Sequence, residues 1–308
     1  MLLSPFDKAQ PLFRGNLHGH TTHSDGLRTS EEVIDAYIVE GYDFTCLSDH
    51  LWHDSYFAAK TVNDATELNR DEFITITSAE LHCLGKKYDN DGLFHIVANG
   101  LPLDFACPDD DETAPHMIHR AIMAGAYVTI AHPEWHALTD EEAEMLSEAH
   151  GVEVYNHSCA VTSGRGSGIA TADKMLHDGH RISFTATDDS HFTGGDYAGG
   201  WVYVAADSLN AQSIVSALKE GRHYSSTGAS FNVIALENDI LMIDCSPVES
   251  IVVSGQGYAA DSKVGRNLTY AEFDLSNFKS DYFRITINDG HGGLAWSNPY
   301  FFDALSED

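Results

Sequence analysis

The chain has 308 residues, of which 43% are hydrophobic, so it is long enough for one large α/β domain and a smaller appendage. Asp and Glu number 47 against 17 Lys and Arg, which gives a formal net charge of −30. A surface of this charge repels phosphate-rich polymers and anionic lipids, so we expect neither long nucleic acid nor a membrane as a partner. The composition favours a small-molecule substrate and leaves room for bound cations.

The N-terminal residues and the cysteines bear on location. The start lacks a basic region and reaches Pro5 early, and no apolar run approaches the length of a membrane span. We therefore expect a soluble, cytoplasmic protein. The five cysteines contain no Cys-x-x-Cys pair, which predicts neither a disulfide framework nor a cysteine zinc site. Histidine is unusually abundant at 18 copies, and its positions decide what it does.

The first strand-like run, over residues 12–17, leads into a possible metal site. His18 and His20 are separated by one residue, so on an extended backbone their imidazoles point the same way. Asp25 follows just before a glycine, and a capping box predicts a helix over 31–40. Taken alone, the His-x-His pair is as consistent with two ordinary half-buried histidines as with metal ligands.

Six more strand-like runs follow, at residues 44–47, 73–82, 93–99, 127–133, 152–157 and 181–191. Loops or predicted helices separate them, the helices lying over 61–70, 115–125 and 140–149, with another ending near Gly179. Each run carries His, Asp or Glu at or near its C-terminal end: His50, Glu80, His82, His95, His132, Glu153, His157, Asp188, Asp189 and His191. Because barrel-type α/β enzymes assemble their sites at strand ends, the pattern predicts such a site here.

Other histidines lack this placement. They lie in predicted helices, turns or the C-terminal region, and we interpret them as solvent-facing or incidental: His116, His119, His136, His150, His177, His180, His223 and His291.

The pattern changes after His191. A strand over 201–206 and a helix over 209–220 precede a turn-rich junction that ends at Gly228. Short apolar runs then alternate with Gly, Asn and Asp turns, at 231–236, 240–243, 251–253, 268–273 and 282–287. This spacing is typical of a small antiparallel β domain. We predict a first domain over residues 1–228 and a β-sandwich-like domain over 229–308.

The ordered motifs resemble one known family. They are His18-x-His20, Ser24-Asp25-Gly26, Ser48-Asp49-His50, Glu80, His95-Ile-Val, Ala131-His132-Pro133, Glu153-Val-Tyr-Asn and Asp189-x-His191. Together they resemble the PHP (polymerase and histidinol phosphatase) family of metallohydrolases over about the first two thirds of the chain. The resemblance implies an α/β fold, a distorted seven-stranded (β/α) barrel, here followed by the small antiparallel β domain.

The resemblance also implies two or three divalent metal ions. One ion would be held by His18, His20, Glu80 and Asp189, a second by Glu80, His95 and His132, and a third by Asp25, His50 and His191. Mixed imidazole and carboxylate ligands suit Zn, Mn or Fe. Asp49 and Glu153 would orient ligands or neighbouring backbone. Asp188 replaces the usual small residue before the motif Asp, and the Asp-x-His spacing favours Asp189 as the ligand.

The implied activity is hydrolysis of a small phosphomonoester through a hydroxide that bridges the metals. Arg14-Gly-Asn and the C-terminal β region resemble the PHP branch that includes carbaryl hydrolase-like members, so a carbamate or carboxylic ester hydrolase is the alternative. A non-enzymatic module is disfavoured because all nine expected ligands are present. For the substrate, Arg165 in a Gly-rich loop is a candidate phosphate clamp, and His157 is a candidate proton donor to the leaving group. The sequence leaves the oligomeric state open.

Overall fold

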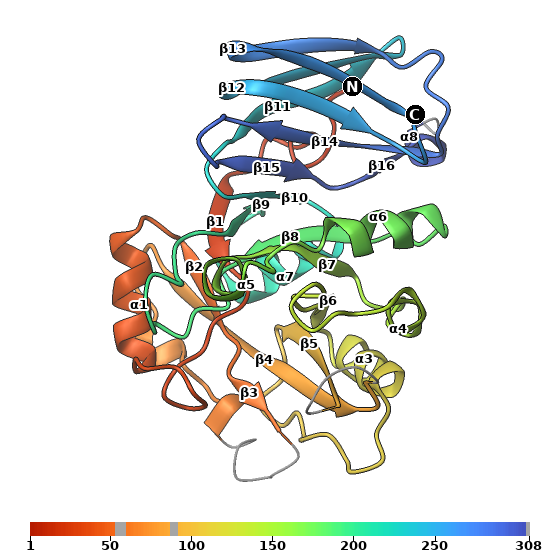
Figure 1. The fold of residues 1–308 in the computed structure, drawn as a ribbon. Coiled ribbons are helices and arrows are strands. Elements are labelled where there is room, and N and C mark those ends of the chain that lie inside the picture. The colour runs from red at the N-terminus through yellow and green to blue at the C-terminus, as the bar shows by residue number, and fades with distance from the viewer. Residues whose placement is uncertain (53–59, 87–91, 306–308) are drawn as a thin grey trace.

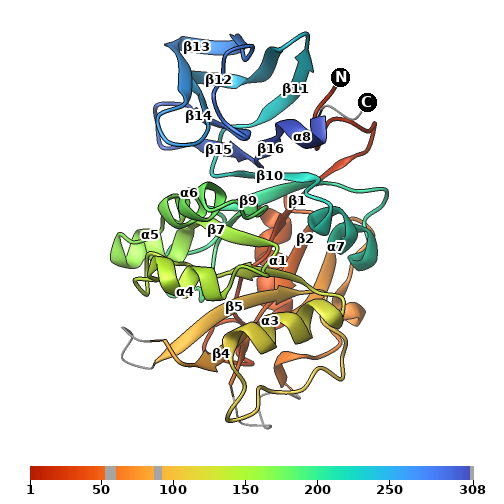
Figure 2. The same cartoon turned by 90° about the vertical axis from the view of Figure 1, so that its right-hand side faces the viewer.

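A computed structural model describes residues 1–52, 60–86 and 92–305 of the chain. An α/β part holds most of the helices, and a part built of antiparallel strands stands on top of it (Figure 1). The N-terminus and the last described helix, α8 (Phe302–Leu305), lie with the antiparallel part (Figures 1 and 2). Across the described ranges, every helix is too short or too polar to cross a bilayer.

Seven strands of the α/β part lie side by side in this order: β1 (Leu12–Asn16), β2 (Phe44–Leu47), β4 (Ile74–Leu84), β5 (Leu93–Asn99), β6 (Tyr127–Ile130), β7 (Gly151–Asn156) and β8 (Ser183–Thr187). All residues of β2, β6 and β8 are buried, as expected for strands covered on both faces. A two-residue strand, β3 (His50–Leu51), pairs with β4 beside β2.

The two ends of this strand order meet at one edge. The amide of Asp189 donates to the carbonyl of His18, and the amide of His20 donates to the carbonyl of Ser190, each over 2.8 Å. These bonds join the segment that follows β1 to the segment that follows β8. The candidate metal ligands that follow β1, His18 and His20, are therefore neighbours of Asp189, which follows β8.

The direction of β5 differs from our expectation. Neighbouring pairs β1–β2, β2–β4, β6–β7 and β7–β8 are parallel, but β5 is antiparallel to both β4 and β6. His95 thus lies near the N-terminal end of its strand, where the register places it opposite His82. The reversal brings that end to the edge where the other strands finish, so His95 reaches the common site from the opposite direction.

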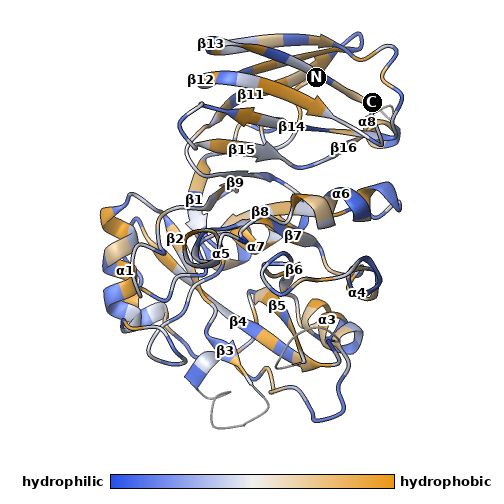
Figure 3. Ribbon diagram, viewed as in Figure 1, coloured by the Kyte–Doolittle hydropathy of each residue, from blue (hydrophilic) through white to orange (hydrophobic). Residues whose placement is uncertain are grey.

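Helices cover the outside of these strands (Figure 2): α1 (Ser30–Val39), α3 (Ala114–Met123), α4 (Asp140–Met145), α5 (His157–Ser163), α6 (Ile169–His177) and α7 (Ala211–Lys219). The predicted capping box opens α1, where the Thr29 hydroxyl accepts from the Glu32 amide at 3.3 Å. Figure 3 shows hydrophilic and hydrophobic residues side by side on α1 and α3, as on surface helices.

The helix expected over 61–70 is largely absent from the described residues there, which hold a short 3₁₀ turn, η1 (Thr66–Leu68). Polar side chains compete with helical hydrogen bonding in this stretch. Asp64 accepts from the Thr66 amide at 3.0 Å, and Asn69 accepts from the Thr75 amide at 2.8 Å.

The remaining strands are β9 (Trp201–Ala205), β10 (His223–Ser226), β11 (Phe231–Glu237), β12 (Ile240–Ser254), β13 (Ala260–Asp274), β14 (Tyr282–Asn288), β15 (Leu294–Ser297) and β16 (Tyr300–Phe301), followed by the short helix α8 (Phe302–Leu305). The runs 240–243 and 251–253, expected as separate strands, belong to the single strand β12. Its register with β13 shifts between Asp244 and Val248, next to Pro247, which has no amide to donate.

The sheet continues from one part of the molecule into the other, because β10 pairs with β9 on one side and with β15 on the other. The N-terminal residues also belong with the antiparallel part. The Leu3 amide donates to the carbonyl of Ile234 at 2.8 Å, and Leu3 is buried in the same core as Phe231 and Ile243. Residues on both sides of position 228 thus share one core, and the division of the chain there stays a prediction.

Candidate metal centre

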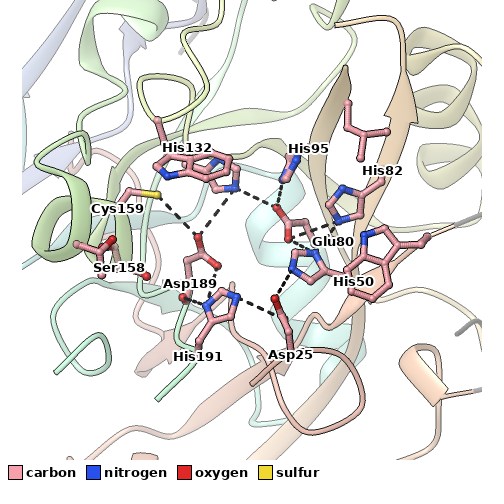
Figure 4. Close-up of a pocket in the computed structure, with 14 residues that line it drawn as sticks. Asp25, His50, Glu80, His82, His95, His132, Ser158, Cys159, Asp189 and His191 are labelled. Atoms are coloured by element: carbon pink, nitrogen blue, oxygen red, sulfur yellow. Dashed lines mark hydrogen bonds and ion pairs between the residues drawn. The ribbon is translucent and has the colours of Figure 1, made fainter. Parts of the chain in front are cut away.

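The strand ends converge on a buried pocket, where Glu80 and Asp189 point inward among histidines (Figure 4). Every predicted metal ligand makes an ion-pair contact with another of the set: His18, His20, Asp25, His50, Glu80, His95, His132, Asp189 and His191. The structure therefore brings together all nine residues that the sequence motifs selected.

Glu80 occupies the middle of the cluster and is 1% exposed. Its Oε1 lies 2.9 Å from Nδ1 of His95 and 3.0 Å from Nε2 of His132. Its Oε2 lies 2.7 Å from Nδ1 of His50. Burial raises the pKa of Glu80, but the imidazoles of His50, His95 and His18 outweigh it and hold that pKa well below its usual value. One carboxylate therefore connects imidazoles on its two sides.

His18, His20 and Asp189 form a second contact group. Oδ1 of Asp189 lies 2.9 Å from Nε2 of His20 and 3.3 Å from Nε2 of His18. The two Nε2 atoms are themselves 3.3 Å apart. Burial lowers the pKa of His18, but Asp189, Glu153 and Glu80 together raise it well above its usual value. The three side chains thus direct their ligand atoms to one small region.

Asp25 links two further imidazoles from a more open position, its side chain being 48% exposed. Its carboxylate oxygens lie 3.3 Å from Nε2 of His50 and 3.4 Å from Nε2 of His191. Nδ1 of His191 lies 2.9 Å from the backbone oxygen of Asp189, to which it donates, so Nε2 is the nitrogen left for Asp25.

The electrostatics of this group favour a positive charge. Burial lowers the pKa of His50, but Glu80 and Asp25 outweigh it and raise that pKa to about 10. Burial also lowers the pKa of His191, but Asp25 and Asp189 outweigh it and raise that pKa to about 9. An imidazole nitrogen facing a carboxylate needs either a proton or a metal ion between them, and the two compete for the same position.

The donor set fits divalent metal ions. Groups of ligand atoms from His, Asp and Glu lie within 4.8 Å of one another: His18, His20 and Glu80; His18, His132 and Asp189; His20, Asp25, His50 and His191; His50, Glu80 and His82; and His95, His132 and His136. Several buried nitrogens here make no hydrogen bond within the described part of the chain: Nδ1 of His82, Nδ1 of His132 and both ring nitrogens of His136. Such atoms are uncommon in protein interiors, and a bound cation would satisfy those that face it.

The two adjacent aspartates have different surroundings. Asp188 accepts backbone hydrogen bonds from Ala198, Gly199 and Gly200, each at 2.8 Å, and another from the Tyr37 hydroxyl at 2.8 Å. Its oxygens are therefore engaged away from the cluster. Asp189 has a left-handed φ of 53°, and its carboxylate faces the histidines. The geometry agrees with the Asp-x-His spacing, which favoured Asp189.

Glu153 and Asp49 support the cluster, as expected. Oε1 of Glu153 lies 2.7 Å from Nδ1 of His18, and Oε2 accepts from the His132 amide at 2.7 Å. Asp49 accepts from the Thr21 amide at 2.7 Å and from the Ser24 hydroxyl at 2.7 Å. It thereby fixes the backbone just before Asp25.

The structure does not bring His157 or Arg165 to the pocket. Strand β7 ends at Asn156, and His157 begins helix α5. Nδ1 of His157 lies 2.9 Å from the Tyr155 hydroxyl, and Nε2 lies 3.1 Å from the carbonyl oxygen of Gly195. The side chain of Arg165 is exposed. Neither residue lines the pocket.

Two histidines in the site received no role from the sequence. His82 is 1% exposed, and its Nε2 lies 2.6 Å from Nδ1 of His50. Its signal was present, because Glu80 and His82 have the same two-residue spacing as His18 and His20. His136 is 5% exposed, so its interpretation as solvent-facing is wrong. His223 is also fully buried and so is not solvent-facing, but it belongs to none of the ligand groups, which agrees with the alternative that it is incidental.

The pocket has a volume of about 380 Å³. Trp52, Leu93 and Trp135 add apolar walls to the His and carboxylate cluster, and Ser158 and Thr162 add hydroxyls. Among the described residues that line it, none is Lys or Arg. Within this described lining, positive charge comes from protonated imidazoles or from bound metal ions.

No protein-family model matches the chain, and no curated protein matches it either. Solved structures do. One is an amidohydrolase from Chromobacterium violaceum, with 15% identity over 57% of this chain and 87% of that chain and a TM-score of 0.40. A putative metal-dependent phosphoesterase from Bifidobacterium adolescentis has 16% identity over 60% of this chain and 88% of that chain, with a TM-score of 0.41.

A third structure matches both parts of the molecule. It is a two-domain protein from Bacteroides vulgatus that contains a predicted PHP-like metal-dependent phosphoesterase. The match has 16% identity and a TM-score of 0.54, and it covers 94% of this chain and 94% of that chain. The chain therefore has the mixed α/β, two-part fold of a PHP-like protein, as the motif resemblance implied.

Proposed function

We propose that this protein is a metal-dependent hydrolase that cleaves a small phosphomonoester. The observation that carries the proposal is the position of Glu80: its Oε1 contacts His95 and His132, and its Oε2 lies 3.6 Å from Nε2 of both His18 and His20. A carboxylate shared in this way suits two divalent ions side by side, an arrangement typical of phosphoester-cleaving sites. The Bacteroides vulgatus protein, described as PHP-like and phosphoesterase-containing, supports the same reaction class.

We propose the ligand groups that the motif resemblance implied, and the contacts are compatible with them. One ion would be held by His18, His20, Glu80 and Asp189, a second by Glu80, His95 and His132, and a third by Asp25, His50 and His191. Zn, Mn or Fe suits such nitrogen and oxygen ligands. When bound, these ions supply Lewis-acid stabilisation of the charge that develops on the phosphoryl oxygens.

The side chains of the protein prepare the site for that chemistry. The Glu153 carboxylate keeps the proton of His18 on Nδ1, which leaves the Nε2 lone pair for the cluster. Trp52 and Trp135 form apolar walls of the pocket and Ser158 adds a hydroxyl, while the Thr162 hydroxyl donates to the backbone carbonyl of Ser158 at 2.6 Å. The substrate is thus held mainly by the metal-ligand cluster and by apolar contact.

Hydrolysis of a carbamate or carboxylic ester is the second candidate, and one observation favours it. The described lining of the pocket contains no Lys or Arg, although a phosphate dianion is commonly held by such a side chain. A neutral ester needs no such clamp. Trp52 and Trp135 would accept an aryl leaving group.

A substrate panel separates the two reactions. The metal-loaded protein should hydrolyse p-nitrophenyl phosphate, nucleoside monophosphates or sugar phosphates faster than bis-p-nitrophenyl phosphate, and removal of metal should abolish the activity. The Glu80→Gln variant serves as the inactive reference. Turnover of naphthyl carbamates or acetates, with no activity on any phosphate ester, would transfer the assignment to the second candidate.

A further inference from the structure

His136 is a buried imidazole beside the proposed metal ions that the ligand groups above do not use. It is 5% exposed, and within the described ranges neither of its ring nitrogens has a hydrogen-bond partner. Leaving a buried polar atom unpaired costs about 1–3 kcal/mol. Among the described residues, another buried histidine outside those groups, His223, keeps one nitrogen 3.2 Å from the carbonyl oxygen of Phe184. The ring nitrogens of His136 therefore need a partner other than a hydrogen-bonding group of the described residues.

Two neighbours of His136 are residues that would hold the second ion. Its ligand nitrogen lies within 4.8 Å of the ligand nitrogens of His95 and His132. Its ring centre lies 5.4 Å from that of His95 and 5.1 Å from that of His132. Nitrogens bound to one zinc ion at about 2.0–2.1 Å are themselves roughly 3–4 Å apart. A small rotation of the rings thus brings all three nitrogens to one ion.

The backbone holds His136 in this position. After β6 the chain folds back on itself, with the Trp135 amide donating to His132 at 3.0 Å and the Leu138 amide donating to Pro133 at 2.9 Å. Ala137 has a left-handed φ of 51°, which closes the turn. The ammonium of Lys86 donates to the carbonyl of Ala137 at 3.4 Å. The imidazole is therefore placed by a tied turn, as a ligand must be.

We infer that His136 is a ligand of the ion that Glu80, His95 and His132 hold. The inference rests on the proposed function, because it presumes a divalent ion at those three residues. This ion has three imidazoles and one carboxylate, a set that selects Zn²⁺ or Fe²⁺ over Mg²⁺. This ion has four protein ligands, whereas the ion at Asp25 has three. A chelator should consequently remove it after the ion at Asp25.

Metal titration of the whole protein tests the assignment. Chelator-treated protein is titrated with Co²⁺ while the visible absorption of the ion is recorded, and the final metal content is measured by elemental analysis. In His136→Ala, the affinity for one ion should fall at least about tenfold and its absorption bands should change, while the other ions bind as before. Added imidazole should restore the lost binding. His223→Gln, which removes a buried imidazole elsewhere, should keep all the wild-type affinities.

Unchanged Co²⁺ affinities and absorption bands in His136→Ala would overturn the inference while leaving the metal centre in place. Less than one metal ion per chain in the wild-type protein, after supplementation with Mn, Zn and Fe, would instead overturn the proposed function. Should His136→Ala fail to fold, a crystal structure of the zinc-loaded wild-type protein decides the matter. A ring nitrogen of His136 at about 2.0–2.1 Å from zinc supports the assignment, and a separation beyond about 2.8 Å refutes it.

Discussion

Oε1 of Glu153 lies 2.7 Å from Nδ1 of His18, and both side chains are fully buried. Since the carboxylate accepts a proton from that nitrogen, it fixes the ring orientation and increases the basicity of Nε2. Glu153→Gln keeps the size of the side chain but removes its charge. We expect about 10–100-fold weaker binding of one metal ion, measured by competition with a chromophoric chelator.

Glu134→Gln is the matched control for this variant. Glu134 is exposed and follows directly after the strand-end motif at His132, and its carboxylate accepts from the Ser167 amide at 2.8 Å. Its replacement should leave metal affinity unchanged. Equal losses in the two variants would mean that the His18 contact is not what matters.

Replacement of Glu80 should be more damaging than replacement of any one imidazole, because its two oxygens contact separate groups of histidines. In Glu80→Gln we expect the loss of two bound ions and a fall in kcat of at least about 100-fold. The exposed His119, which pairs with Glu148, provides the control in His119→Asn. Full metal content in Glu80→Gln would contradict a shared ligand.

Much of this cluster was predictable because strand residues alternate sides. His18 and His20 share one side of their segment, whereas the Asp-x-His motif of the family resemblance selected Asp189 from two adjacent aspartates. The same rule applied to His82 would have placed it in the pocket. Its position opposite His95 could not be predicted, because a reversed strand carries the same apolar pattern as a parallel one.

Other features depend on boundaries and turns that the sequence pattern does not specify. His157 is the first residue after β7. A strand longer by one residue would include it, but in the structure it begins α5. His136 reaches the cluster only through the backward turn after His132. The two apolar runs of β12 are joined through Pro247, a residue that ordinarily marks the end of a strand.

Metal binding should release protons. The carboxylates around His50 and His191 raise their pKa values to about 10 and about 9, so both rings are protonated in the metal-free protein at pH 7. A metal ion at Asp25 must displace these protons, about two per ion, so its affinity should increase with pH up to about pH 9–10. Calorimetry in buffers of different ionisation enthalpy measures the number released. An affinity that stays constant between pH 6 and 9 would contradict the assignment.

The buried His223 should make folding stability depend on pH. Burial lowers its pKa to about 4, compared with about 6.5 in the unfolded chain. Below pH 6.5 the unfolded state therefore binds the proton more readily, so stability is present at neutral pH and is lost as the pH falls toward 4. Between pH 7.5 and 4.5 this histidine should contribute about 2–3 kcal/mol to the decrease in unfolding free energy.

Comparison with His223→Gln isolates this contribution. Denaturant unfolding of both chelator-treated proteins at pH 7.5 and 4.5 gives the two decreases, and the variant should lose about 2–3 kcal/mol less than the wild type. All other titrating groups are common to the two proteins and cancel in the difference. Identical pH dependence would show that His223 is not a buried neutral ring.

The contact between the two parts of the molecule includes an ion pair of Arg284 in β14 with Asp173 in α6. Nε and one terminal nitrogen of the guanidinium donate to the two carboxylate oxygens, each at 2.7 Å, and Arg284 is 8% exposed. Arg284→Ala should lower the unfolding free energy by about 1.5–3 kcal/mol, because a two-bond contact between a buried guanidinium and a partly exposed carboxylate is lost. Arg181 pairs with Asp303 across the same boundary, but both side chains are more than half exposed. Arg181→Ala should therefore cost less than about 1 kcal/mol. If denaturant unfolding of Arg284→Ala shows an unchanged midpoint, or if the two variants lose the same stability, the buried pair does not hold the β part to the α/β part.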